Sequence, residues 1–166
     1  MQTFDQWSAS RGEMVAEAID AHREVICQRV STRLAKSFPK LCYTPVRQNA
    51  RAFQQSSFYE TPRRFHRLVQ VVVLCGSMDC VEREYLWGWN ILKRYGVDRR
   101  HMQAQVWWYF EAVFDTLPLN TDDHAQLKRL CEDMVRVIDR VARGGTPNGY
   151  ERVRRRYTGS RARNTN

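Results

Sequence analysis

The sequence predicts an all-α protein, because its apolar residues recur at three- and four-residue intervals and its segments carry helix-capping residues at their ends. No segment alternates apolar and polar residues over a useful length, as a strand would. The 166 residues suffice for one domain with a single core, and 43% of them are apolar. No apolar run reaches the roughly 18 residues of a membrane span, and MQTFDQWSASRGE lacks the features of a signal peptide. We therefore expect a soluble, cytoplasmic protein.

A first helix is expected from about Ser10 to Ser37. Ser10 followed by Glu13 has the form of a capping box. The apolar residues that follow have the spacing of an amphipathic helix: Met14, Ala18, Ala21, Val25, Cys27, Val30 and Leu34. Pro39 interrupts this pattern, so the helix should end there, and a shorter helical segment is expected over residues 46–55.

Two helices joined by a glycine are expected next. Pro62 suits the first turn of a helix that should end at Gly76. Asp79 with Glu82 has the form of a second capping box, and Gly96 closes the helix that it opens. The chain therefore contains a helix-glycine-helix segment.

Two further helices complete the predicted domain. Asp98 can cap the first of them, and Pro118 ends it. Its segment MQAQVWWYFEAVFDTL is apolar over most of the helix circumference, so we expect it to lie centrally. Asn120 or Thr121 can cap the last helix, which has one apolar stripe: Leu127, Leu130, Cys131, Met134, Val135, Ile138 and Val141.

The net charge of +9 is concentrated at the C-terminus. Residues 143–166 hold seven arginines and one glutamate, whereas residues 1–142 hold 20 basic and 17 acidic residues. This tail has few apolar residues, so it cannot bury enough surface to offset the entropy lost on ordering. We expect a helical domain over 1–142 and a disordered basic tail, whose arginines could contact nucleic acid or another acidic surface: Arg152, Arg154, Arg155, Arg156, Arg161 and Arg163.

The five cysteines show no pairing typical of a metal site or a disulfide framework. They are Cys27, Cys42, Cys75, Cys80 and Cys131, with no C-x-x-C spacing among them. Most lie among apolar neighbours at helical positions. We expect them to pack in the core as small apolar residues.

The segment 63–97 resembles the helix-glycine-helix segment that holds the pigment in phycobiliproteins. In that family a motif C-x-R-D-x-x-Y-Y-L-R leads into V-T-Y-x-L-V-A-G-D. The corresponding residues of this chain are F-Y-E-T-P-R-R-F-H-R followed by L-V-Q-V-V-V-L-C-G-S. Arg67 and Gly76 match the family motif. RLAKSFPKL, KRYGVDRRHMQAQVWWYFEAV and LPLNTDDHAQLKRLCEDMVRVIDRVA are similar to other family segments. The resemblance covers about residues 14–142. It implies a globin-like fold with helices around a tetrapyrrole-sized cleft.

The chain departs from this family at three pigment-related features. Phe58, or Ser57 with another gap placement, takes the place of the bilin-bearing cysteine, which excludes a thioether there. Glu60 and Thr61 take the places of the arginine and aspartate that contact the pigment. Only about nine residues precede the predicted first helix, so we expect a truncated N-terminal hairpin. The resemblance therefore implies the family frame without a covalent bilin.

A non-covalent bilin or haem in the same cleft remains an alternative. Arg63 and Arg64 could meet its propionates together with the matching Arg67, or they could be solvated arginines on a helix start. His66 is the one histidine expected near a tetrapyrrole, where it could be an axial ligand. The other interpretation of His66 is a half-exposed surface residue.

Two cysteines and the aromatic residues offer further candidate contacts to a flat ligand. Cys75 and Cys80 flank Gly76 and could carry a pigment by another linkage, although Cys75 continues a run of valines and should pack in the core. Trp87 and Trp108 could stack on a ring system. Trp87 and Trp89 cannot share one helix face, so at least one should point outward.

Three functions remain open at this point. The sequence has no nucleophile elbow, phosphate loop or metal-ligand spacing, so we expect a protein that is not an enzyme. We favour a phycobiliprotein-like interaction or regulatory module without covalent bilin, acting in phycobilisome assembly or turnover or as a sensor. Its partners would be phycobiliprotein-like subunits or a second copy of the chain. The alternatives are a non-covalent tetrapyrrole carrier and a nucleic-acid binder that uses the tail.

Overall fold

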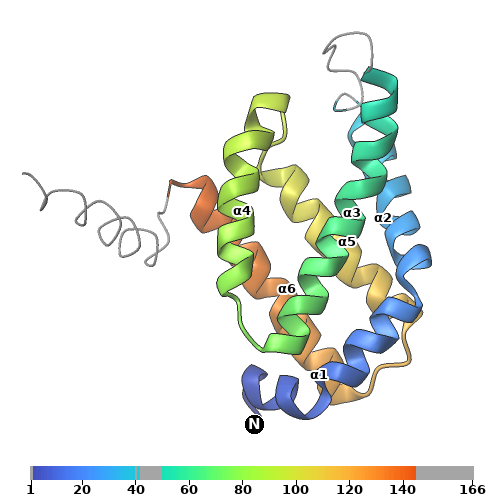
Figure 1. Cartoon of the computed structure of the whole chain (residues 1–166), viewed down its shortest axis with the longest axis vertical. Coiled ribbons are helices and arrows are strands. Elements are labelled where there is room, and N and C mark those ends of the chain that lie inside the picture. Colours follow the sequence, from blue (N-terminus) through green and yellow to red (C-terminus); the bar gives the residue numbers. More distant parts are fainter. Residues whose placement is uncertain (1, 40, 42–49, 145–166) are drawn as a thin grey trace, which may run out of the picture.

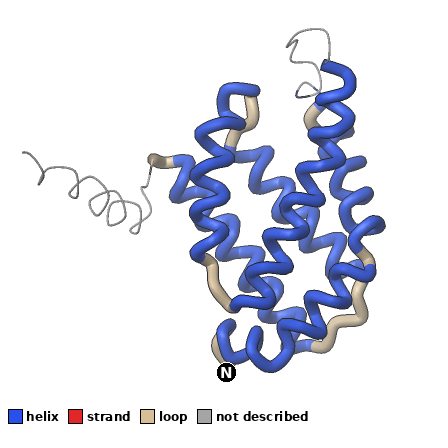
Figure 2. The backbone as a smooth tube through the Cα atoms, viewed as in Figure 1, coloured by secondary structure: helices blue, strands red, loops and turns tan. Residues whose placement is uncertain are grey.

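The computed structural model describes residues 2–39, 41 and 50–144, and this part of the chain is helical without any strand. The helices are α1 (Phe4–Ala21), α2 (Arg23–Ser37), α3 (Ala50–Cys75), α4 (Asp79–Leu92), the short 3-10 helix η2 (Lys93–Tyr95), α5 (Arg99–Thr116) and α6 (Thr121–Ala142). Short loops join most of them (Figure 2). The all-α prediction is confirmed.

The helices pack around one shared core. Helix α3 packs against α1 and α2, α5 packs against α2 and α6, and α4 packs mainly against α6 (Figure 1). Helix α3 ends at the turn around Gly76, where φ is +66°, and α4 runs back from this turn antiparallel to α3. The core is apolar, and its largest fully buried side chains include Trp7, Ile19, Ile26, Tyr109, Phe110, Leu127 and Met134.

The N-terminal helix differs from the prediction at both ends. It begins at Phe4 rather than after Ser10, because Thr3 caps it: the Thr3 hydroxyl accepts from the Gln6 amide at 3.3 Å, and the Gln6 side chain accepts from the Thr3 amide at 3.1 Å. The expected continuous helix is also wrong, because His22 separates α1 from α2. There Nδ1 of His22 lies 2.9 Å from a carbonyl oxygen of the preceding turn, a local contact that competes with regular helix bonding.

Pro62 lies inside α3 rather than at the start of a new helix. Proline removes one backbone hydrogen bond from a helix, so a break was the simpler expectation. Pro62 is buried, and the helix is held by packing against α1 and α2. Packing therefore outweighs the local preference here. Of the shorter segment predicted over 46–55, residues 50–55 belong to α3, so the prediction of a separate helix there is wrong, and residues 46–49 lie outside the described residues.

The later helix ends follow the sequence more closely. Asp98 caps α5 as predicted, by accepting from the amides of Arg100 and His101. Of the two candidates predicted for α6, Asn120 is the cap, and it accepts from the Asp123 amide. Gly96, with a φ of +80°, ends η2. Asp79 differs, since it is the first residue of α4 rather than its cap.

Helix α5 is not enclosed on all sides. Val106, Tyr109 and Val113 face the core, but Trp107 is 47% exposed and Glu111 is exposed beside it. The prediction of a central helix is therefore wrong for this outer face.

Candidate functional site

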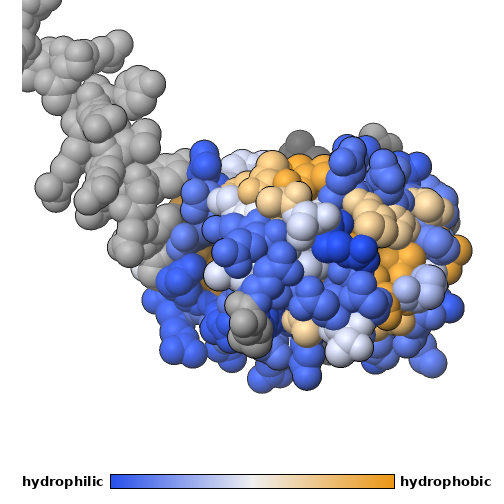
Figure 3. Space-filling view, turned by 90° about the horizontal axis from the view of Figure 1, so that it is seen from below, coloured by the Kyte–Doolittle hydropathy of each residue, from blue (hydrophilic) through white to orange (hydrophobic). Residues whose placement is uncertain are grey.

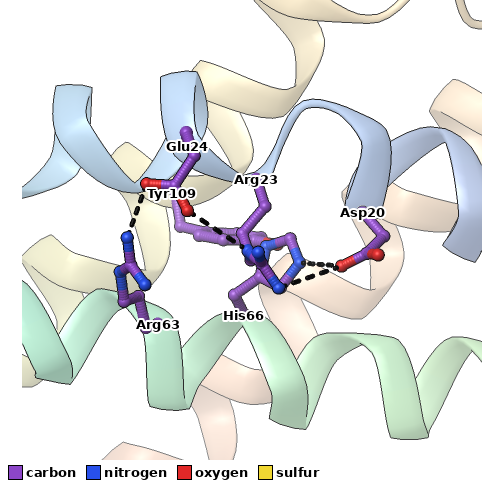
Figure 4. Close-up of polar contacts among 6 residues, drawn as sticks. All are labelled: Asp20, Arg23, Glu24, Arg63, His66 and Tyr109. Atoms are coloured by element: carbon purple, nitrogen blue, oxygen red, sulfur yellow. Dashed lines mark hydrogen bonds and ion pairs between the residues drawn. The ribbon is translucent and has the colours of Figure 1, made fainter.

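A buried polar cluster joins α1, α3 and α5 at the bend between α1 and α2 (Figure 4). His66 of α3 and Tyr109 of α5 both have 0% exposure, and His66 Nδ1 lies 2.9 Å from the Tyr109 hydroxyl. The other ring nitrogen, Nε2, lies 3.4 Å from a carboxylate oxygen of Asp20. We call His66, Tyr109 and Asp20 the His66 cluster.

The partners of His66 determine its hydrogen-bonding roles. A carboxylate only accepts hydrogen bonds, so Nε2 carries the proton that faces Asp20 and Nδ1 accepts from the Tyr109 hydroxyl. Burial lowers the pKa of His66, and the neighbouring Asp20 opposes this shift. Burial also raises the pKa of Tyr109. The ring is therefore neutral near pH 7, with both nitrogens in contact with partners.

This cluster is closed to a reactant. Neither His66 nor Tyr109 presents any surface, so a substrate or metal would first have to displace Tyr109 or Asp20. The interpretation of His66 as a half-exposed surface histidine is wrong, because the two partners lie in α1 and α5, which the sequence does not place next to residue 66. In this conformation the cluster joins α1, α3 and α5 through hydrogen bonds.

Arg63 reinforces the same region from one turn away. Its guanidinium lies 2.5 Å from a carboxylate oxygen of Glu24 in α2, and Arg23 lies 3.4 Å from the other oxygen (Figure 4). Arg23 also lies 3.8 Å from Asp20. Arg63 is therefore committed to an ion pair within the fold rather than displayed toward a ligand.

A second polar cluster joins α1 to the start of α6. Asp123 is 3% exposed, accepts from the indole Nε1 of Trp7 at 2.9 Å and forms a two-pronged ion pair with Arg11 at 2.6 and 3.2 Å. Burial alone would raise the pKa of Asp123, but the hydrogen bonds from Arg11 and Trp7 outweigh it and hold the pKa below its ordinary range. We call these three residues the Asp123 cluster. No sequence signal predicted this cluster beyond the position of Asp123 in the first turn of a helix.

An exposed surface lies on α3 and α4, and we call it the α3–α4 face: Arg64, Arg67, Val71 and Leu74 on α3, and Glu84, Trp87 and Ile91 on α4. Arg64 connects the two helices, because its Nε lies 2.5 Å from a Glu84 oxygen and its guanidinium lies 4.4 Å from the centre of the Trp87 ring. Trp87 is 52% exposed, whereas Trp89 is partly buried against the core. The expectation that one of these two tryptophans points outward is confirmed.

The candidate residues do not converge on one pocket. Trp108 of α5 packs instead at the C-terminal end of α2, stacked 5.8 Å from Phe38 with the Arg33 guanidinium 4.8 Å above its ring. One described surface depression runs along the outer side of α2 past Val25, and a second lies beside Phe4 and Gly76; they are not lined by His66, Trp87 or Trp108. Arg64, Arg67 and Trp87 thus share a face, while His66 lies beneath it and Trp108 lies elsewhere.

The cysteines divide between core and surface. Cys27 and Cys131 are buried as expected, and burial raises the pKa of their thiols to about 11 and about 12. Cys80 is partly buried, and burial raises its pKa too. Cys75 is exposed, so its predicted core position is wrong: it lies one turn after Val71, on the outward side of α3. Cys42 lies outside the described residues.

Some predicted positions lie outside what the structure describes. The six tail arginines are among residues 145–166, and the side chains at Ser57 and Phe58 are likewise outside the described part. Within that part, no three His, Cys, Asp or Glu side chains group as a metal site would require. None of the described helices combines the length and apolar content needed to cross a bilayer.

Comparison with known proteins found no matching family model, no matching curated protein and no matching solved structure.

Proposed function

We propose that this chain is a non-enzymatic interaction module built on a phycobiliprotein-like, globin-like frame without a covalent bilin. The observation that carries the proposal is the α3–α4 face. Leu74 and Trp87 expose 51% and 52% of their surfaces, next to Val71 and Ile91 at 44% and 37%. Apolar residues gathered on a surface are typical of contact sites for other molecules.

The frame itself is supported by the order of the helices and by the turn at Gly76. The described chain has a helix, a glycine with a positive φ and a second helix in the order of the segment on which the resemblance rests. Phe58 at the pigment-anchoring position removes the thioether link. Such a frame would act in phycobilisome assembly or turnover, or as a sensor.

The tetrapyrrole carrier is less well supported than the interaction module. His66 is the one histidine considered as an axial ligand, and both of its ring nitrogens already contact partners, Tyr109 and Asp20. Arg63 is paired with Glu24 and Arg64 with Glu84, so neither arginine is held ready for a propionate. Binding a pigment there would require these contacts to be replaced.

Absorption spectra separate the two functions. The full chain is incubated with haem or with biliverdin, freed of excess pigment and measured beside the His66→Ala and His101→Ala variants. The proposal expects no bound-pigment band in any of the three proteins. A haem or bilin band that disappears in His66→Ala and persists in His101→Ala would establish the carrier instead.

Photo-crosslinking in the host cell tests the association directly. A photoreactive benzoylphenylalanine replaces Trp87 in one protein and Trp107 in another, because both positions are exposed but lie on α4 and α5 respectively. We expect adducts from position 87 and few from position 107. Absence of adducts at position 87, with the folded protein present, would contradict an interaction through this face.

A further inference from the structure

We propose that the α3–α4 face binds an acidic amphipathic helix of a partner protein. This inference rests on the proposed function and names the chemistry of its partner. It depends on two properties of the face: exposed apolar side chains arranged along two helices, and an excess of arginine side chains around them.

The apolar side chains lie in two rows. Val71 and Leu74 are three residues apart on α3, and Trp87 and Ile91 are four apart on α4, so each pair lies along one side of its helix. Seen from below, the mostly hydrophilic surface of the molecule carries several distinct hydrophobic patches (Figure 3). A partner helix can place its own row of apolar side chains along such rows, which is a common mode of helix recognition.

The position of Trp87 makes it the expected anchor of the interface. The Arg64 guanidinium lies over one side of its ring, and the Glu84 carboxylate holds that guanidinium in place. An aromatic ring supported in this way loses little freedom when a partner covers it. Tryptophan and arginine are also the residue types that most often dominate binding energy.

The charge around these rows is positive. Glu84 is engaged by Arg64, and within the described part Arg67 and Arg94 have no ion-pair partner. Arg83 is exposed too and donates to a backbone carbonyl. Among the described residues of these two helices, the exposed carboxylates Glu60 and Asp79 lie toward the ends of the face, and the partly exposed Glu82 and Glu84 are paired with Arg140 and Arg64. A partner with acidic residues beside its apolar stripe therefore complements the face.

The same charge disfavours a second copy of the chain as the occupant. Two α3–α4 faces brought together would place the arginines of one copy near those of the other. Like charges placed opposite each other reduce affinity. An acidic partner gains from the charge that a second copy would have to overcome.

The test uses the full chain and three fluorescent peptides of about 18 residues, or about five helical turns. The first has a leucine stripe flanked by glutamates, the second has lysines for the glutamates, and the third has serines for the leucines. Fluorescence anisotropy gives the affinity of each. We expect the first peptide to bind best and to weaken as salt is added.

Matched variants locate the binding site. Trp87→Ser should weaken binding of the acidic peptide about tenfold or more, and Arg67→Glu should weaken it several-fold. Trp107→Ser and Arg100→Glu change exposed residues of the same types on α5 and should leave the affinity unchanged. Circular dichroism and thermal unfolding confirm that each variant is folded.

Four outcomes would overturn the inference. The first is equal binding of the acidic and lysine peptides, and the second is an affinity that the two α5 variants lower as much as Trp87→Ser and Arg67→Glu do. The third is self-association of the chain that Trp87→Ser abolishes. The fourth is binding to anionic lipid vesicles through Trp87 without binding to the acidic peptide. If crosslinks form at position 87 but the peptide does not bind, only the partner chemistry is wrong. If a pigment band appears and depends on His66, the proposed function itself fails.

Discussion

The two buried polar clusters hold their helices together in opposite electrostatic ways. In the Asp123 cluster an ionised carboxylate is buried, and a cation that reaches the surface compensates it: Asp123 is 3% exposed, while the Arg11 side chain is 33% exposed. In the His66 cluster the buried groups, His66 and Tyr109, are neutral, and the charged Asp20 stays half exposed. A charge can thus be buried with its partner at the edge, or neutral groups can be buried with the charge at the edge.

This difference determines how each cluster responds to mutation and to pH. Removing one member of a buried charge pair leaves the other groups poorly compensated, which costs more than removing one neutral hydrogen bond. The Asp123 cluster should therefore be more sensitive to substitution. As the pH falls, the stability that the His66 cluster contributes should begin to decline at a higher pH than that of the Asp123 cluster, because histidine titrates above aspartate.

The largest effect is expected for Asp123→Ala. This variant removes the acceptor of the Trp7 indole and the partner of Arg11, so we expect a loss of about 3 kcal/mol in the free energy of unfolding. Asp122→Ala is the matched control, since Asp122 is exposed in the same helical turn and should cost about 0.5 kcal/mol or less. Urea unfolding measures both. Equal losses would show that the carboxylate acts through the helix dipole alone.

A smaller effect is expected for Tyr109→Phe, at about 1 to 2 kcal/mol, because it leaves Nδ1 of the buried His66 without its donor. The control is Tyr85→Phe. Tyr85 is also buried, but its hydroxyl has no hydrogen-bond partner within the described part of the chain. Removing that hydroxyl should be neutral or slightly stabilising. Thermal unfolding of the two variants side by side measures the difference. An equal loss of stability in Tyr109→Phe and Tyr85→Phe would contradict the predicted contrast.

The smallest effect is a pH dependence of stability that arises from His66. Its pKa is lowered in the folded protein, so between the folded and unfolded pKa values the unfolded state binds more protons. The stabilisation is complete above about pH 6.5, the ordinary pKa of histidine, and declines as the pH falls below it. For Asp123, whose pKa is also lowered, the decline begins only below about pH 4.

Urea midpoints measured from pH 7.5 down to about pH 5 should therefore fall less steeply in His66→Gln than in the parent protein. The other histidines titrate in both proteins, so the comparison isolates residue 66. Parallel slopes in the two proteins would show that His66 keeps its ordinary pKa in the folded state. The midpoint difference near pH 7 reports separately on the packing cost of the substitution.

Local sequence signals predicted the helical class and several helix ends. Asp98, Asn120 and Gly96 act through neighbouring backbone groups, so their roles follow from residue type and position. Pro62 and His22 did not follow such rules. Pro62 sits within a helix that tertiary packing maintains, and His22 interrupts an apolar pattern that continues through it.

The candidate site was predictable only in part. The outward position of one of Trp87 and Trp89 follows from helical geometry, but the choice of Trp87 depends on which side of α4 meets α6. The exposure of Cys75 likewise depends on the orientation of α3. Contact of His66 with Tyr109, 43 residues away, could not be seen in the spacing of either residue.

The sequence by itself determined the all-α class, the main helical segments and the concentration of positive charge in residues 143–166. These properties arise from local backbone preferences, apolar periodicity and composition, which act between near neighbours. The tertiary structure decided which polar groups are buried together and which apolar side chains remain exposed on the α3–α4 face. Those outcomes depend on how whole helices are oriented against each other, and that orientation is set by contacts between residues far apart in the chain.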